Sequence, residues 1–355
     1  MRSRIAFGYA AGAGKYWPAE ELVVMLQESA SMSYEIKTHG RIGTELQKLA
    51  REEINRIIVA LRTLNAATLD DLTHEIRKRL KRVRALLSLV REPVGKKRFR
   101  AEDGVFREVE QALGAMRDAH ALRETLDGLQ RRFFPGKPPA RLRGVRQKLG
   151  TDERLRASAL VGSGVLRKQI VCLQAALDRV GDWPVGDYGW KELRRAVKHS
   201  YRRSRECRER MHDAPGAARL HRWRKRTNDL CLYLRMLRHI CPVLTEELAH
   251  DFEVLGEFLG DDHDLVVLRA ALEKQRKTIL HRPARTAFLK LLDLRQQELC
   301  DAAFALGKRL HADSPQVFAR KLGERRATVR QRTRKARKLT RKLSASRHPR
   351  GEAGA

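Results

Sequence analysis

Two short stretches of this 355-residue chain read almost alike. Residues 74–79 are HEIRKR and residues 221–226 are HRWRKR, so both follow the pattern His-x-x-Arg-Lys-Arg. Downstream, LGAMRD at 113–118 resembles LGDDHD at 259–264. The two motifs recur in the same order, 147 and 146 residues apart. Two ordered motifs at matched spacing predict an internal duplication, with two similar helical halves facing each other across a pseudo-twofold axis.

The apolar residues around these motifs repeat with the period of an α-helix. One such stripe begins at Ile42, Asp70 is placed to cap the next helix, and the breaker FPGKPP at 134–139 ends a fourth. The alternation of apolar and polar residues that is typical of β-strands is nearly absent. We therefore predict an all-α protein with a linker at 182–189. Its later helices are expected near 152–181, 189–212, 216–240, 244–259, 264–280 and 284–311.

Each repeated motif is predicted to lie on a helix with one basic and one apolar face. At about 100° per residue, the basic face of the first copy carries His74, Lys78, Lys81 and Ala85, flanked by Arg77 and Arg84. The second copy presents His221, Lys225 and Asn228, flanked by Arg224. The opposite, apolar faces hold Ile76, Leu80, Val83, Leu87 and Val90 in the first copy and Trp223, Leu230, Leu234 and Leu237 in the second.

This basic face, with almost no acid predicted on it, suits a phosphate chain. A single basic face is usually only solvated, but two copies with the same order of His, Arg and Lys favour an anion site. Arg binds two phosphate oxygens at once, Lys adds a mobile charge, and His titrates near neutral pH. Neighbouring rows on a helix are about 5–6 Å apart, close to the repeat of a phosphate chain.

The helix before the second motif carries further basic residues. Arg194, Lys198, Tyr201 and Arg205 recur at helical spacing, with Arg195 and Arg202 beside them. A solvated basic helix and a second wall of the same site explain this pattern equally well, and the sequence leaves both open.

Together these features resemble the CHAD family, the conserved histidine α-helical domain, over about residues 42–312. Further marks are Phe99-Arg100, Phe106-Arg107 and the stretch YRRSR at 201–205. The resemblance implies two four-helix bundles about a pseudo-twofold, with a central basic groove that binds inorganic polyphosphate, and an association with polyphosphate granules. Asn228 and Cys231 stand where the family usually has Lys and Arg, and the Asn often found after the first motif is replaced by Asp103 or absent.

The net charge of +32 points to a polyanionic partner. Residues 320–350 supply +13 of it and residues 1–319 supply +20, so the charge is not confined to the tail. The tail has a weakly helical pattern. It is a candidate to extend the groove or to contact nucleic acid nonspecifically, and we expect it to be disordered in the free protein. The composition excludes a disordered chain, and no apolar run is long enough to span a membrane.

Other chemistry-bearing patterns are weaker. The run GDDHD at 260–264 is expected to be a loop followed by Asp264 as a helix N-cap, rather than a metal site. The motif histidines come without a paired carboxylate or nucleophile, which favours anion binding over acid–base catalysis. GAGK at 12–15 lacks the spacing of a phosphate loop. We predict no catalytic residue, no metal and no cofactor.

We therefore expect a poorly ordered extension over 1–40, a first helical half over 41–182, a second over 183–313 and a basic tail over 314–355. The predicted function is non-catalytic binding of inorganic polyphosphate. A nucleic-acid-binding protein is the alternative, and a phosphate-metabolism enzyme is less favoured. The five scattered cysteines fit a cytoplasmic protein, and the oligomeric state stays open. The predicted polyphosphate contacts are His74, Arg77, Lys78, Lys81, Arg84, Arg107, Lys198, Arg202, Arg205, His221, Arg224, Lys225 and Asn228.

Overall fold

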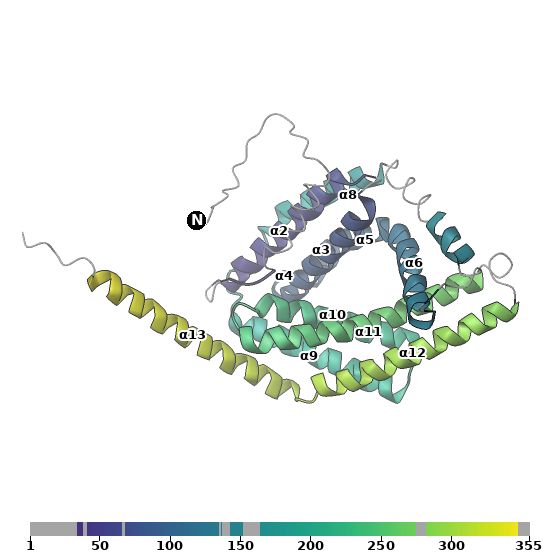
Figure 1. The fold of residues 1–355 in the computed structure, drawn as a ribbon. Helices are drawn as coiled ribbons and strands as arrows, with labels where there is room; N and C mark the ends of the chain where they lie inside the picture. The colour runs from purple at the N-terminus through teal and green to yellow at the C-terminus, as the bar shows by residue number, and fades with distance from the viewer. Residues whose placement is uncertain are drawn as a thin grey trace, which may run out of the picture. The chain divides into compact units, whose positions relative to one another are not determined.

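All regular structure in the part of the chain described by the computed structural model is helical (Figure 1). The described residues are 34–37, 41–65, 68–134, 136, 143–151, 164–274 and 282–346. The helices are α2 (Ile42–Thr63), α3 (Leu69–Leu89), α4 (Arg91–Val94), α5 (Lys96–Ala112), α6 (Gly114–Phe133), a short helix over 143–151, α8 (Val165–Val180), α9 (Trp190–Asp213), α10 (Ala217–Leu237), α11 (Pro242–Lys274), α12 (Arg282–Leu310) and α13 (Pro315–Ser346). The predicted all-α class is confirmed.

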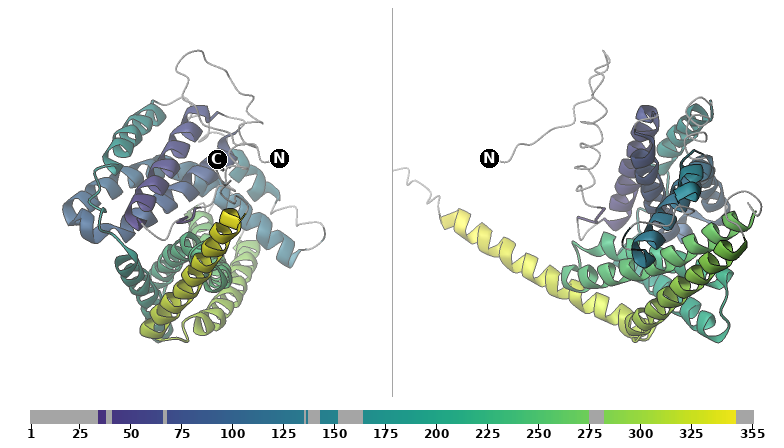
Figure 2. Two further views of the ribbon diagram at one scale, coloured as in Figure 1. Left: turned by 90° about the vertical axis from the view of Figure 1, so that its left-hand side faces the viewer. Right: turned by 45° about the vertical axis from the view of Figure 1, so that its right-hand side comes forward.

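The helices pack in two main groups. In the first, α2 lies against α3 and α8, and α5 contacts both of these partners. In the second, α10 lies against α9 and α11, while α12 packs on α11 and also touches α9. Figure 2 shows the green α10, α11 and α12 running beside one another in both views. The two motif helices, α3 and α10, contact each other between the groups.

One apolar cluster joins segments that are far apart in the sequence. Leu126 and Leu129 of α6 share it with Leu268 of α11 and Leu292 of α12, all at most 4% exposed. The helix over 143–151 contributes Val145 and Leu149. By sequence, α6 belongs to the first repeat, but its apolar face packs on helices of the second. The cluster therefore ties the two repeats together through burial of side chains.

The apolar faces predicted for the motif helices are buried. Ile76, Leu80 and Val83 on α3 and Trp223 and Leu230 on α10 have no exposed surface. Burying a large apolar side chain stabilises a fold by roughly 1.5–3 kcal/mol. These residues fix which side of each motif helix faces outward. One prediction was wrong in detail, since Ala85, placed on the basic face, is only 2% exposed.

Two helix boundaries differ from the predictions. α3 begins at Leu69, with Thr68 at the N-cap position, so Asp70 lies inside the helix and does not cap it. α11 runs unbroken from Pro242 to Lys274, so the loop predicted at 260–264 and the N-cap at Asp264 were wrong (Figure 1). In the first repeat the chain does break at the matching place, because α5 ends at Ala112 and α6 begins at Gly114.

The basic tail is also helical. α13 spans Pro315–Ser346 where disorder was expected, while residues 347–355 lie outside the described part. Phe318 and Leu322 are buried, and the Phe318 ring stacks on Tyr201 with a centroid distance of 4.1 Å. Two apolar anchors in its first two turns thus hold α13 on α9.

The chain segment before α2 contributes to the packing. Tyr34 and Ile36, inside the predicted 1–40 extension, are buried. The Tyr34 hydroxyl donates to the Arg82 carbonyl at 3.1 Å, and the Ile36 amide donates to the Met236 carbonyl at 3.0 Å. This short segment therefore contacts both motif helices, α3 through Arg82 and α10 through Met236. The rest of the predicted extension falls outside the described residues, except Glu35 and Lys37. Among the described helices, none is both long and apolar enough to cross a membrane.

Candidate anion-binding site

The first motif helix holds two arginines in place with carboxylates from α5. Arg84 donates to Asp103 at 2.8 Å and to Glu110 at 2.7 Å. Arg77 donates to the Glu110 carbonyl oxygen at 3.3 Å and lies 3.7 Å from its carboxylate. Arg107 on α5 also pairs with Asp103, at 2.7 Å. The expectation of an almost acid-free face was wrong, because the acids come from a neighbouring helix that a single-helix pattern does not include.

The remaining cations of the first copy are more open to solvent. His74 and Lys81 are exposed, and the Lys78 side chain is 40% exposed with Glu75 at 3.8 Å. The half-buried arginines are thus fixed in direction, whereas the lysines are long and more exposed to solvent. A charged ligand would meet both kinds of group on one helix.

The second copy gathers residues of α10 and α11. The rings of His221 and His263 lie 5.0 Å apart, and Arg224 is 3.8 Å from Asp264. Lys225 is exposed. The loop that was predicted at 260–264 is instead a helix surface that brings His263 and Asp264 against the motif. His263 was therefore missed as a neighbour of His221, although its place in the repeated LGDDHD stretch marked it.

Two glycines of α11 lie at its contact with α10. A side-chain carbon added to Gly256 would lie 2.6 Å from the Asn228 amide oxygen, and one at Gly260 would lie 3.5 Å from the Arg224 guanidinium. The side chains of Asn228 and Arg224 thus pack against α11 at its two glycines. The structure brings these two predicted site residues to the interface between α10 and α11.

Burial and local charge both favour the neutral form of His221. Its pKa is lowered first by burial and then by the nearby cations of Arg224 and Lys225. A bound polyanion would oppose those cations and favour the protonated ring, which could then donate to phosphate from both nitrogens. One turn beyond Lys225 on α10, burial raises the pKa of Asp229, although the nearby cations of Arg226, Lys225 and Arg84 act in the opposite direction. The influence of Arg84 on Asp229 fits the contact between α3 and α10.

The last arginine of the first motif points inward. Arg79 has no exposed surface and donates to Glu53 of α2 at 3.0 Å, while Arg82 donates to the same carboxylate at 3.2 Å. The motif thus divides its charges between an outer surface and an internal ion-pair network. In the second copy, Arg226 pairs with Asp229 at 3.4 Å.

The basic residues predicted on α9 lie in two different environments. Arg205 donates to the Asp313 carbonyl at 3.0 Å and to Glu209, so it fixes the turn before α13. Arg202 is exposed, beside His199 at 2.9 Å. Lys198 lies one turn before Arg202 and is half-buried. Tyr201 of the same stripe is buried. The hydrogen-bond partners of Arg205 thus lie on α9 and in the turn before α13.

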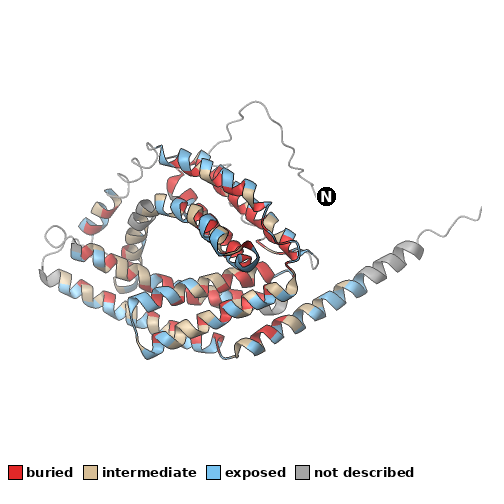
Figure 3. Ribbon diagram, turned by 180° about the vertical axis from the view of Figure 1, so that it is seen from behind, coloured by how far each residue is buried: buried red, intermediate tan, exposed pale blue. Residues whose placement is uncertain are grey.

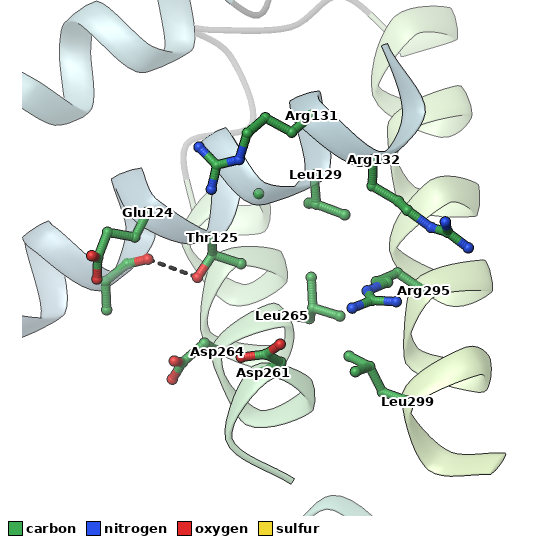
Figure 4. A pocket seen from close by; sticks show the side chains of 12 residues that line it. Glu124, Thr125, Leu129, Arg131, Arg132, Asp261, Asp264, Leu265, Arg295 and Leu299 are labelled. Atoms are coloured by element: carbon green, nitrogen blue, oxygen red, sulfur yellow. Dashed lines mark hydrogen bonds between the residues drawn. The ribbon is translucent and has the colours of Figure 1, made fainter. Parts of the chain in front are cut away.

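A cavity of about 360 Å³ lies between α6, α11 and α12 (Figure 4). Asp261 and Asp264 line one side, and Arg132 and Arg295 line another, where both pair with Glu298 at 3.2 and 2.9 Å. Burial raises the pKa of Asp261. Through Asp264, which also faces Arg224, the cavity adjoins the second motif.

Within the described ranges, no group of three or more His, Cys, Asp or Glu side chains is arranged to hold a metal ion. All five cysteines are free thiols.

The fold and the site define a class: an all-α protein in which two copies of a basic helix motif lie on contacting helices. A family model described as the CHAD domain matches residues 49–273, well over half of the chain. The chain therefore belongs to the CHAD domain family, and the matched range falls inside the 42–312 expected from the motifs. A comparison with curated proteins found no match.

Proposed function

We propose that this protein binds inorganic polyphosphate through a basic groove lined by α3 and α10, and that it does not alter the chain chemically. The observation that carries the proposal is the repeated His-x-x-Arg-Lys-Arg motif on two helices in contact. Membership of the CHAD family supports the choice of ligand. Arginines that carboxylates hold in place would each donate two hydrogen bonds to phosphate oxygens. The exposed lysines would adapt to a flexible phosphate chain.

The proposed groove requires a particular arrangement of the two helix groups. We propose that α2, α3, α5 and α8 form one four-helix bundle and that α9, α10, α11 and α12 form the other, related by a pseudo-twofold axis. Support comes from the packing partners within each group and from the α3–α10 contact between them. The motif residues of both copies would then face a common groove.

Polyphosphate is favoured over nucleic acid at this site because the motif offers charge without stacking surfaces. Proteins that bind single strands usually present aromatic side chains to the bases. The motif helices carry Trp223 and Tyr233, and both are buried. A chain of phosphates without bases needs only the cations.

Binding without turnover is the second part of the proposal. His74 and His221 lie among arginines and lysines, whereas acid–base catalysis or metal-assisted hydrolysis needs further partner groups around them. Incubation with polyphosphate and Mg²⁺ is expected to release no phosphate. Steady release that is lost when the motif residues are changed would favour the enzyme alternative. We further propose a cytoplasmic location, with an association with polyphosphate granules as the family resemblance implies.

The test is a variant that removes charge without removing the buried ion pairs. Lys78→Gln, Lys81→Gln and Lys225→Gln change three solvent-accessible lysines on the two motif helices. Polyphosphate affinity near physiological salt should fall at least about tenfold, and its dependence on salt should flatten. Helical content, measured by circular dichroism, should be unchanged.

A matched variant controls for net charge. Lys48→Gln, Lys168→Gln and Lys290→Gln remove the same charge from exposed positions on α2, α8 and α12. This control should bind polyphosphate within about twofold of the unaltered protein, because unpaired surface charges away from a site act weakly. Equal losses in the two variants would show that only net charge matters and would overturn the proposed groove.

A further inference from the structure

The charged residues in the distal part of α13 are all basic. Residues 325–346 contain ten Lys or Arg and no acid, and the last acid of the helix is Glu324. The segment lies outside the range matched by the CHAD model, which ends at residue 273. The family assignment therefore does not account for it.

α13 is anchored at its start and largely exposed at the described positions that follow. Phe318, Ala319 and Leu322 are buried, and Arg326 lies over the Trp190 ring at 4.6 Å. Beyond Leu322, none of the α13 side chains that the structure describes, through Ala336, is buried (Figure 3). Within 325–336 all residues except Arg326, Val329 and Thr333 are exposed, so most of the basic side chains in this stretch are accessible to a partner.

Near its anchored end, this basic segment lies beside further positive charge. α9, which α13 contacts, brings further positive charge close by. A carbon added at Gly323 would lie 3.0 Å from the guanidinium of Arg194. The pKa of Arg326 is lowered by burial and then by its neighbour Arg330. Crowded like charges cost free energy that an anionic partner would relieve.

The arrangement of side chains narrows the kind of partner. Viewed down the helix, Val329, Thr333 and Ala336 follow the anchor residues along one side, and the ten basic residues flank this stripe and cover the opposite face. No Phe, Tyr or Trp follows Phe318 in the sequence. Stacking on single-stranded bases relies on aromatic side chains, so the pattern favours a partner recognised by its phosphates.

We propose that residues 325–346 of α13 bind duplex DNA, lying in the major groove and contacting phosphates without reading sequence. The segment has 22 residues and is therefore about 33 Å long, close to one turn of B-DNA. A helix about 10–12 Å across fits the roughly 12 Å major groove. The deep, narrow major groove of A-form RNA does not admit it. This proposal is independent of the polyphosphate site on α3 and α10.

The test uses the full chain with Arg330→Gln, Arg332→Gln, Arg334→Gln and Lys335→Gln. These four residues are exposed, and Gln preserves helix propensity. The probe is a mixed-sequence DNA duplex of about 20 base pairs, titrated at several salt concentrations. We expect affinity to drop at least about tenfold at low salt, and the slope of log K against log salt to fall by about 3–4.

The control has the same charge change elsewhere: Lys48→Gln, Arg62→Gln, Arg167→Gln and Lys168→Gln on α2 and α8, all exposed. It should keep both the affinity and the salt slope of the unaltered protein. The proposal is overturned if the α13 variant and this control bind DNA alike, or if an RNA duplex binds as tightly as the DNA duplex. Since the α13 variant should retain its polyphosphate affinity at the groove, loss of one activity is distinguishable from loss of the other.

Discussion

Glu53 on α2 is 2% exposed and receives hydrogen bonds from two arginines of α3. The sequence marks Glu53 only as a charged residue within an apolar stripe, and the helical pattern alone does not reveal its partners. Arg79 and Arg82 lie 26 and 29 residues away on the next helix. The outward direction of Lys81 and the burial of Leu80 followed from the helical period. The ion pairs were not predicted, because they depend on how α2 and α3 pack against each other.

Replacing Glu53 should therefore be costly. Glu53→Ala would leave Arg79 and Arg82 buried without their shared carboxylate, and losing one partner of a buried ion pair typically costs about 3–5 kcal/mol. Urea unfolding followed by circular dichroism measures the change. Glu108→Ala, at an exposed site on α5, is the control and should change the free energy of unfolding by less than about 0.5 kcal/mol. A small effect at Glu53 would mean that the network does not stabilise the fold.

At the scale of the helices, the predictions succeeded where they followed the helical repeat of apolar residues. They failed where they relied on local composition. α11 continues through 260–264, although Gly and three Asp suggest a loop, because Gly260 lies close to Arg224 and Asp262 is buried. α13 forms a helix although its charge suggested disorder, since Phe318 and Leu322 anchor it. In both cases tertiary contacts override a local signal.

The start of α2 depends on a close backbone contact. Its Gly43 amide donates to the Tyr188 carbonyl at 3.0 Å, and an added side-chain carbon would lie 1.9 Å from the Val185 carbonyl oxygen. Gly43→Ala is expected to lower the free energy of unfolding by about 1–3 kcal/mol through overpacking. Gly104→Ala, in the middle of α5 with open space around it, should instead raise it by about 0.5–1 kcal/mol. Thermal or urea unfolding of both variants checks the opposite signs, and equal shifts would refute the close contact.

The junction of α9, α12 and α13 contains a buried neutral histidine. The His311 Nδ1 donates to the Gly307 carbonyl at 2.9 Å, and its Nε2 accepts from the Ser204 hydroxyl at 3.1 Å. Burial, with smaller contributions from Arg208 and Arg205, lowers its pKa to about 4. Because the folded pKa lies below the unfolded one, the unfolded chain binds the extra proton first as pH falls.

Stability should accordingly decline as pH drops from about 6.5 to 4, by up to about 3 kcal/mol from this residue. His311→Gln removes the titrating group, so the free energy of unfolding should vary less across that window. His212→Gln, on an exposed side chain, should leave the pH dependence intact. The measurement is urea unfolding at several pH values. An undiminished pH dependence in His311→Gln would contradict the assignment.

At the scale of the whole molecule, the repeat in the sequence corresponds to two motif helices that touch. The spacing of the motifs predicted two related halves but not the way α6 shares a core with α11 and α12, since that cluster joins residues more than a hundred positions apart. The charge is likewise distributed over two surfaces, the motif helices and distal α13. A net charge of +32 alone does not separate them.

The most direct measurement is a competition between polyphosphate and duplex DNA for the α13 variant, at equal phosphate concentration and near-physiological salt. In this variant the motif helices are unaltered, and we predict that polyphosphate stays bound while DNA fails to displace it. Adding the three motif substitutions should then lower polyphosphate affinity at least about tenfold. Preferential binding of DNA by the α13 variant, or polyphosphate affinity that the motif substitutions leave unchanged, would contradict binding at the motif helices.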